Sequence, residues 1–568
     1  MKLVKILLFI TSFIYQLIVA SHVVERSVGN VDLIFWIASL VLLYLSFPFS
    51  QKKLKKTLKS HSDRKIYPFV FLVILIALIV RIAPAPYTMI FHTDEYLTAH
   101  FSYSIGDLTN LDWFGVYPPK GEWVCQFPIL YFFFQKLFFN IFGVGTVSMR
   151  LSALPYVLIV FISLFLISKH LYNERVALST ITLLSLFSPD LYLTRWALHF
   201  TSSTALFLVA TYFFILCLKF GKKIHFGLLG FFLGLCYMTY YSSYIAVPLL
   251  SLYLFILIIK GQINAPSLKN FLLPLVIFLY TMGPLFIYAA KVDNFFTQRT
   301  AQVKLINGLW SPYQNIEINP KSVLEILEKQ NTLSIKSLYT DGIGGHGGYV
   351  FGNLALFDKL TFFFFLLSSI YFLYKIIKDK DAKSVFILAT IVISFVTGMV
   401  LTFPPPAFHR FSIAFPFITL LIAVTINNLY SYIKQKKGKL AFLVLILCIT
   451  AIMISNVLHF RKILISEQPD NPDYPIIEYY LDKQGEKMVY IAAFNSYGFG
   501  RFLFIRSGGT INSLTKSLDE LLKVIPKNRV STLVILYPNE EMYQKVVTSF
   551  PNTKKIGQYR WHLVLSVN

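Results

Sequence analysis

The chain has 568 residues, of which 56% are hydrophobic, 17% aromatic and only 14% charged. Soluble domains average about 25% charged residues, so this composition excludes an ordinary soluble protein and predicts a polytopic membrane protein. The formal net charge of +24 would suggest nucleic acid as a partner in a soluble protein. Here Lys and Arg fall in short clusters between apolar runs of membrane-spanning length, so we interpret the charge as topology and contact with anionic lipid, and expect no nucleic acid.

The first 65 residues predict two membrane helices and a basic loop. Residues 1–20 place Lys2 and Lys5 before an apolar run that ends in small residues, which is typical of either a signal peptide or a retained helix. We favour the retained helix, and both alternatives leave 21–30 outside. A second helix, about 31–48, returns the chain to the cytoplasm. The segment 51–65 carries seven Lys or Arg against a single acid, Asp63, which is a strong cytoplasmic signal.

In the rest of the membrane region, basic and non-basic connections alternate between successive apolar spans. Further spans are expected at about 67–84, 147–167, 174–190, 200–219, 224–242, 246–259, 270–290, 361–378, 385–403, 411–429 and 440–458. The basic connections are 169–175, 219–223, 260–269, 375–383 and 434–439. All of them lie inside when the N-terminus is cytoplasmic. The sequence therefore predicts about thirteen helices in a multi-pass plasma-membrane protein.

Three regions are expected outside: the loop after the third helix, a second loop at about 291–360, and the C-terminal tail. In the first loop, 128–142 resembles helices that lie in the membrane interface. The alternative, one more transmembrane helix, is disfavoured because it would invert every later basic loop. The tail reads as a small extracytoplasmic α/β domain with short strands at 488–493, 531–536 and 562–567 and an amphipathic helix at 513–524. The predicted parts are 1–65, 66–460 and 461–568.

Two adjacent carboxylates, Asp94 and Glu95, follow the third helix directly on the outer side. A carboxylate there could act as general base for sugar transfer from a polyprenyl-phosphate donor, because the acceptor hydroxyl loses a proton as it attacks the anomeric carbon. The leaving group is already a phosphate ester, so no general acid is needed, unlike in glycoside hydrolysis. A solvated loop start or a helix cap is the alternative interpretation of the pair.

The leaving phosphate needs positive charge near the outer headgroup level. Candidates at outer helix ends are Lys120, Arg195, Arg299, His409 and Arg410. For Arg195 and the His409–Arg410 pair, the competing interpretation is a simple interfacial anchor.

The second outer loop contains a glycine-rich stretch, 342–352, that includes His346. It could form a mobile lid in which His346 contacts phosphate or sugar, or it could be a loose connection. In the first loop, His92, Asp94 and Glu95 could together bind a divalent cation such as Mg²⁺ or Mn²⁺. We expect no obligatory metal or other cofactor, because a monophosphate-linked donor has little charge to neutralise.

Several of these motifs, taken in order, resemble one family. The sequence is similar to the GT-C superfamily of membrane glycosyltransferases, in its protein O-mannosyltransferase and aminoarabinose transferase (PMT-like) branch. Asp94-Glu95 looks like that family's Asp-Glu motif. The other matching segments are 127–131, 142–143, 149–154, 188–195, and more weakly 299–303, 341–352 and 406–410 with Pro416.

The resemblance covers about 65–460 and implies a GT-C fold, Asp94 as the base, a polyprenyl-phosphate sugar donor, and inversion at the anomeric centre without an obligatory metal. Glu95 would orient the acceptor or bind the sugar. The sequence departs from the family pattern at Thr194, where the family often has Ser, and at His199, where related sequences often carry an acid. The two helices before residue 65 are additional to the family core.

The sequence thus predicts a transferase that moves one sugar to a protein, glycan or lipid acceptor outside the membrane. A transporter or flippase of lipid-linked sugars is the first alternative. It predicts ionisable residues deep within helices or internal repeats, whereas the candidate charges cluster at outer helix ends. A non-catalytic scaffold is the second alternative, and it predicts that Asp94→Asn leaves function intact.

Overall fold

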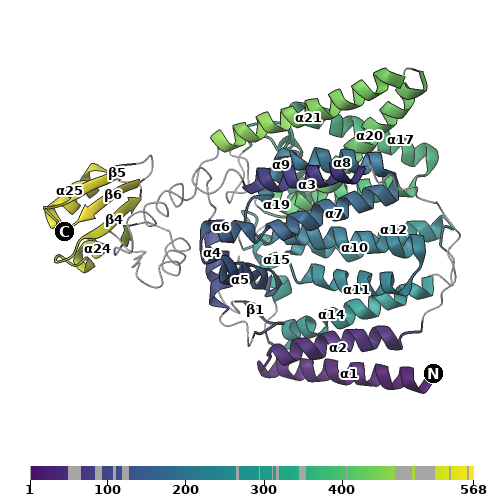
Figure 1. Cartoon of the computed structure of the whole chain (residues 1–568), viewed down its shortest axis with the longest axis horizontal. Helices are drawn as coiled ribbons and strands as arrows, with labels where there is room; N and C mark the ends of the chain where they lie inside the picture. Colours follow the sequence, from purple (N-terminus) through teal and green to yellow (C-terminus); the bar gives the residue numbers. More distant parts are fainter. Residues whose placement is uncertain are drawn as a thin grey trace.

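The computed structural model shows a bundle of long helices with roughly parallel axes, followed by a small sheet (Figure 1). It describes residues 2–48, 66–82, 93–105, 111–117, 127–263, 268–292, 295–309, 311–314, 319–343, 354–403, 406–436, 438–466, 489–492, 518–536, 539–558 and 562–568. The basic loop 51–65, Lys120, Cys125 and the glycine-rich stretch from 344 on lie outside these residues.

The chain begins with a helical hairpin. It consists of α1 (Lys2–Glu25) and α2 (Asn30–Ser46), and α3 (Tyr67–Ile82) follows later in the chain. Gln16 of α1 donates to Ser39 of α2 at 2.9 Å and to the carbonyl of Tyr280 at 3.0 Å, so the hairpin is fixed to a helix of the main bundle. This packing accords with a retained first helix, and whether the segment is cleaved stays a prediction.

The helices of the bundle coincide with the predicted spans. They are α7 (Leu154–Leu171), α8 (Glu174–Ser185), α9 (Ser188–Thr194), α10 (Phe200–Phe220), α11 (Lys223–Tyr237), η3 (Tyr241–Ile245), α12 (Ala246–Ile259), η4 (Lys269–Phe271), α14 (Leu272–Lys291), α17 (Lys359–Asp379), α18 (Ala382–Phe395), the π-helical turn η5 (Val396–Val400), α19 (Phe408–Phe411), η6 (Ser412–Ala414), α20 (Phe415–Lys436) and α21 (Gly438–Ser466).

Within the described residues, nine helices are long and apolar enough to cross a membrane, and a bent pair would make ten. The bent pair is α8 with α9, which meet at 62° where the sequence predicted a single span at about 174–190. Pro189 near the start of α9 prevents the helix from continuing straight. The helices α2, α3 and α11 are apolar but shorter, with 17, 16 and 15 residues. A multi-pass membrane protein is supported, and the count of thirteen stays a prediction.

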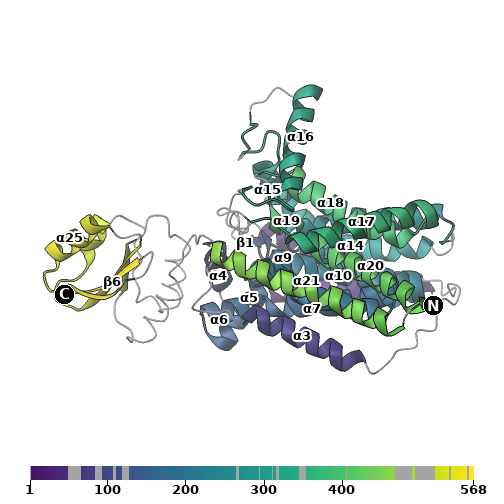
Figure 2. The ribbon, with the colours of Figure 1, turned by 90° about the horizontal axis from the view of Figure 1, so that it is seen from above.

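Short elements gather at one end of the bundle (Figures 1 and 2). They are α4 (Thr93–Ser104), β1 (Val116–Tyr117), β2 (Phe127–Pro128), α5 (Leu130–Phe142), α6 (Thr146–Leu151), α15 (Phe295–Val303) and α16 (Pro320–Lys336). The predicted interfacial segment 128–142 forms α5, a short amphipathic helix that buries Tyr131 and Phe132 and leaves Ile141 61% exposed.

The basic connections meet at the opposite end. Lys169 pairs with Glu174 at 2.7 Å, Lys219 lies 3.2 Å from the ring of His170, and Lys383 donates to the carbonyl of Leu171 at 2.7 Å. Three loops far apart in sequence therefore share one face, as the predicted alternation requires. Which face is cytoplasmic remains a prediction.

The C-terminal residues form a four-stranded sheet in the order β3-β4-β6-β5. Its elements are β3 (Val489–Ala492), α24 (Leu518–Val524), β4 (Ser531–Leu536), α25 (Glu540–Ser549), β5 (Lys554–Gln558) and β6 (His562–Val567). β3 and β4 are parallel, and β6 is antiparallel to both β4 and β5. Leu533, Leu565 and Val546 belong to a hydrophobic cluster of their own. The strands lie where alternation predicted them, whereas α25 and β5 were not predicted.

Candidate functional site

The acidic pair lies in the first turn of α4, at the end of the bundle that carries the short elements. Asp94 is 5% exposed and Glu95 is fully buried. Carboxylates are favoured in a first helical turn because the peptide dipoles leave partial positive charge there. The hydroxyl of Thr98 donates to the backbone carbonyl of Asp94 at 2.6 Å, which fixes the turn. The pair is therefore enclosed in the protein rather than part of a solvated loop start.

Glu95 binds groups from two other segments of the chain. One oxygen of Glu95 accepts from Arg150 at 3.1 Å, and the other accepts from the backbone amide of Ala197 at 2.9 Å. Arg150 belongs to α6 and Ala197 to the short segment between α9 and α10. Glu95 thus joins three segments that are distant in sequence.

A second buried ion pair stands close by at the break between α8 and α9. Arg81, near the end of α3, pairs with Asp190 and donates to the hydroxyl of Thr194 at 2.7 Å and to the carbonyl of Ser185 at 3.2 Å. Backbone carbonyls at the end of α8 have no partner within the helix, and Arg81 donates to one of them, that of Ser185. Arg81 therefore fixes the end of α3 against the bend. Sequence reasoning missed this residue, although a lone Arg within an apolar run is a usable signal.

Aromatic rings connect the remaining candidates. The ring of His199 lies 4.3 Å from Phe127 and 4.8 Å from Tyr240, measured between centroids. Tyr240 lies 4.2 Å from Tyr241 and 6.1 Å from His409. The strand β2, the α9–α10 segment, η3 and α19 therefore converge. Phe127, His199, Tyr240 and Tyr241 are called the aromatic cluster below.

The imidazole of His199 lies between opposite charges. It interacts electrostatically with Asp94, which raises its pKa, and with Arg299, which lowers it. Burial has the largest effect and lowers the pKa of His199 to about 3. The ring is therefore neutral at physiological pH. His199 therefore adds no positive charge next to Asp94 and Arg299.

A cavity of about 280 Å³ opens beside the aromatic cluster. Its polar lining includes Tyr241, Thr300, Lys304, Thr402 and Arg410. The guanidinium of Arg299 donates to the hydroxyl of Tyr241 at 3.1 Å, on the wall of this cavity. Cationic and hydroxyl groups from four segments thus surround one space, which suits an anionic ligand.

The π-helical turn η5 forms one wall of this cavity through Thr397 and Gly398. Such turns are rare and frequent at functional sites. A Cβ atom on Gly398 would lie 2.7 Å from the carbonyl oxygen of Arg410, so only glycine allows η5 and Arg410 to approach this closely. Gln330 of α16 donates to the carbonyls of Met399 and Thr402, both at 3.2 Å, and thereby satisfies carbonyls at the turn.

The other predicted site residues have separate positions. The guanidinium of Arg195 lies over the rings of Tyr192, Trp196 and Phe460, at 4.7, 5.8 and 5.8 Å from their centroids. This places it on the side of α21. Lys120 and His346 lie outside the described residues, and so does His92. Among the residues that the structure describes, no three His, Cys, Asp or Glu side chains are grouped as metal ligands.

The arrangement is similar to known proteins. Residues 126–288 match the family model described as dolichyl-phosphate-mannose-protein mannosyltransferase. ArnT from Cupriavidus metallidurans, solved with bound undecaprenyl phosphate, superimposes with a TM-score of 0.54 at 12% identity, over 88% of this chain and 98% of that one. The fold is that of the GT-C glycosyltransferases. The apo oligosaccharyltransferase from Archaeoglobus fulgidus gives a TM-score of 0.50 at 14% identity, over 79% of this chain and 64% of that one. No curated protein matches the sequence.

These comparisons confirm the GT-C, PMT-like resemblance inferred from the ordered motifs. The family match includes Arg150, Arg195, His199, Tyr240 and Tyr241. It begins after the acidic pair and ends before Arg299. Any role of Asp94, Glu95 or Arg299 therefore rests on the geometry given above and not on the family match.

Proposed function

We propose that the protein is a membrane glycosyltransferase that moves one sugar from a polyprenyl-phosphate donor to a hydroxyl acceptor. The observation that carries this proposal is the aromatic cluster, which links His199 to Tyr241 on the wall of the cationic cavity. His199 interacts electrostatically with Asp94, and Tyr241 accepts a hydrogen bond from Arg299. A base on one side and phosphate-binding groups on the other are what this transfer requires. The GT-C fold, shared with a protein that binds undecaprenyl phosphate, supports the same donor class.

In the proposed reaction, Asp94 accepts the proton of the acceptor hydroxyl while its oxygen attacks the anomeric carbon. The bond between that carbon and the phosphate oxygen breaks, and the carrier phosphate leaves with the bonding electrons. Attack opposite the leaving group inverts the anomeric centre. Glu95 positions Asp94 through its bonds to Arg150 and Ala197. The products are the glycosylated acceptor and a polyprenyl phosphate.

The cavity is the proposed site of the donor phosphate. Arg299 and Arg410 would bind the phosphate oxygens, with Lys304 on the same wall and His409 behind the aromatic cluster. Lys120, Arg195 and His346 remain proposed donor contacts. No metal is needed for this chemistry, since the leaving phosphate is neutralised by side chains, although a divalent cation is compatible with the His92, Asp94, Glu95 set.

The orientation follows from the charge distribution. We propose that the end carrying the basic loops faces the cytoplasm and that the site and the C-terminal sheet lie outside. Acceptor hydroxyls of proteins, glycans or lipids all fit the chemistry. The C-terminal residues 461–568 would form an extracytoplasmic α/β domain. A flippase for lipid-linked sugars is the second candidate, since it would also bind a phosphate in such a cavity.

The test is transfer of radiolabelled sugar from a panel of polyprenyl-phosphate donors to membrane acceptors. Loss of an enzymatic base should reduce the rate on the order of a hundredfold or more in Asp94→Asn. Asp379→Asn is the matched control, because that carboxylate is exposed at the opposite end of the bundle. Equal transfer by wild type and Asp94→Asn would refute the proposed base. Movement of the lipid-linked sugar across vesicles, without transfer, would favour the flippase.

A further inference from the structure

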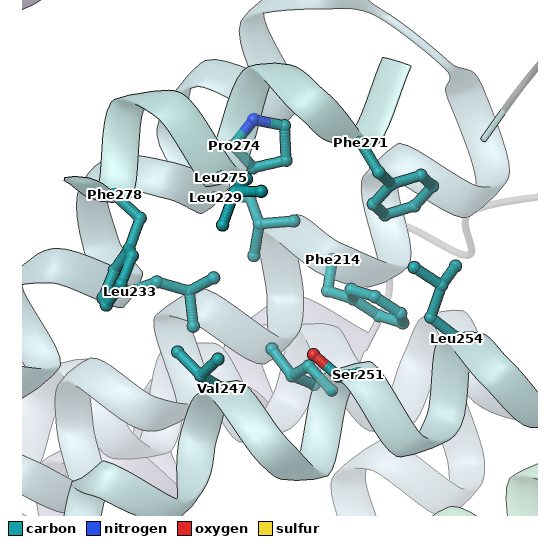
Figure 3. A pocket seen from close by; sticks show the side chains of 11 residues that line it. Phe214, Leu229, Leu233, Val247, Ser251, Leu254, Phe271, Pro274, Leu275 and Phe278 are labelled. Atoms are coloured by element: carbon teal, nitrogen blue, oxygen red, sulfur yellow. The ribbon is translucent and has the colours of Figure 1, made fainter. Parts of the chain in front are cut away.

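A second hollow of about 200 Å³ lies among α10, α11, α12 and α14, and Figure 3 shows the side chains that line it. Four helices line it. The described lining residues are Phe214 of α10, Leu229 and Leu233 of α11, Val247, Leu250, Ser251 and Leu254 of α12, Pro274, Leu275 and Phe278 of α14, and Phe271 of η4. We call this space the lateral groove. Among the described residues that line the groove, Ser251 alone is polar.

The groove has a closed floor and an open rim. Phe214, Leu229 and Leu250 are at most 3% exposed, whereas Leu275 is 51% exposed. The volume is several times the roughly 30 Å³ that one molecule occupies in liquid water. An apolar space of this size does not hold water stably. In a membrane, its open side faces lipid, so a hydrocarbon chain is the fitting occupant.

The groove exists because two helices approach each other unusually closely. A Cβ atom on Gly230 would lie 2.4 Å from the carbonyl oxygen of Pro274, and one on Gly234 would lie 2.3 Å from a side-chain atom of Thr281. Small residues at this spacing draw α11 onto α14, as is usual between membrane helices. The large side chains of α12 cannot follow into that contact, so an opening remains between α12 and the α11–α14 pair.

The chemistry around the groove selects an anionic occupant. From Leu191 to Val292, which includes all four lining helices and their connections, the sequence contains no Asp or Glu. Lys260 directly follows α12, and Lys269 lies two residues before Phe271 at the end of the groove. Lys269 is exposed. Basic residues at the membrane surface beside an interhelical hollow attract acidic headgroups.

We propose that the lateral groove binds an anionic glycerophospholipid of the bilayer, with one acyl chain in the groove and its phosphate at Lys260 and Lys269. The acyl chain fills the space between α12 and the α11–α14 pair and packs against both. The described linings of this groove and of the donor cavity share no residue. The proposed lipid site is independent of the proposed transferase activity.

Native mass spectrometry of the full-length protein tests the proposal. The protein, delipidated in detergent, is titrated with phosphatidylglycerol, phosphatidylcholine or undecaprenyl phosphate, and the bound fraction is measured. We expect phosphatidylglycerol to bind with preference over phosphatidylcholine. Leu254→Trp should abolish that binding by filling the groove, whereas Leu252→Trp, on the same helix outside the lining and 39% exposed, should not.

A second variant tests whether lipid binding depends on the positive charge of Lys260 and Lys269. Lys260→Glu/Lys269→Glu should weaken phosphatidylglycerol binding on the order of tenfold and leave phosphatidylcholine binding unchanged. Lys378→Glu, in another basic connection, is the control. If Leu254→Trp is not monodisperse, Ser251→Phe fills the groove from its rim. Equal binding of all three lipids, unchanged binding in the groove variants, or stronger binding of undecaprenyl phosphate at this groove would overturn the proposal.

Discussion

Glu95 and Arg150 illustrate how a buried charge is tolerated in this bundle. The two side chains are 0% and 6% exposed and lie 3.1 Å apart. Removing one member of such a pair leaves an uncompensated charge, which typically costs about 3–5 kcal/mol. We therefore expect Glu95→Gln to lower thermal stability strongly in detergent, measured by size-exclusion chromatography after heating.

The double variant Glu95→Gln/Arg150→Met separates charge from contact. It also removes the guanidinium that has lost the Glu95 carboxylate, and should recover much of the lost stability. Activity should stay low in the double variant, because the bridge that positions Asp94 is still absent. Recovery of both stability and activity would argue against a positioning role for Glu95.

His199 gives the site a pH-dependent stability. Its pKa is lowered from 6.5 to about 3 in the folded protein, mainly by burial. Between these values the unfolded state binds more protons than the folded state, so stability falls as pH falls below about 6.5. The contribution approaches ~1.4 kcal/mol per pH unit. Unfolding temperatures of wild type and His199→Gln, measured from pH 7 to pH 4.5, should diverge in slope, with the variant the less sensitive.

At the level of elements, the bend between α8 and α9 depends on Arg81. Its guanidinium pairs with Asp190 and binds Thr194 and the Ser185 carbonyl. We expect Arg81→Met to destabilise the protein by about 3–5 kcal/mol, because the buried carboxylate of Asp190 loses its counter-ion. Arg81→Met/Asp190→Leu should regain a large part of this. Thermal unfolding of the three proteins measures the effect, and equal losses in single and double variants would contradict it.

The π-helical turn η5 is the second element that can be tested. Gly398→Ala places a methyl group 2.7 Å from the carbonyl oxygen of Arg410, so the cavity wall must shift. We expect a raised KM for the polyprenyl-phosphate donor, by roughly tenfold if about one phosphate contact is lost. Gly283→Ala is the control, because its nearest neighbour would be Gln16 at 3.5 Å. An unchanged KM in Gly398→Ala would separate this cavity from donor binding.

The helices were predictable because apolar length and charge alternation act along the chain. The acidic pair, Asp94 and Glu95, was also predictable from local sequence, because it directly follows a predicted span. The convergence of Phe127, His199, Tyr240 and Tyr241 was not predictable, because it depends on how four segments pack. The ion pair of Arg81 with Asp190 joins residues more than a hundred positions apart, and no local pattern encodes such a partner.

For the whole molecule, the orientation in the membrane decides whether the proposed site meets acceptors outside the cell. The basic connections share one end, and Asp94, Arg299 and the cavity lie at the other. Anionic lipid and the positive-inside rule favour the basic end in the cytoplasm. Single-cysteine variants in a background without native cysteines can test this with a membrane-impermeant maleimide.

Leu309 and Gln262 are suitable positions, because both are exposed and lie at opposite ends of the bundle. Leu309→Cys should react in intact cells, whereas Gln262→Cys should react only after permeabilisation. The contrast arises because a charged reagent cannot cross the hydrocarbon core. The reverse pattern would place the carboxylate and the cavity in the cytoplasm. In that case the acceptor would have to be a cytoplasmic hydroxyl, and the extracytoplasmic assignment of residues 461–568 would be wrong as well.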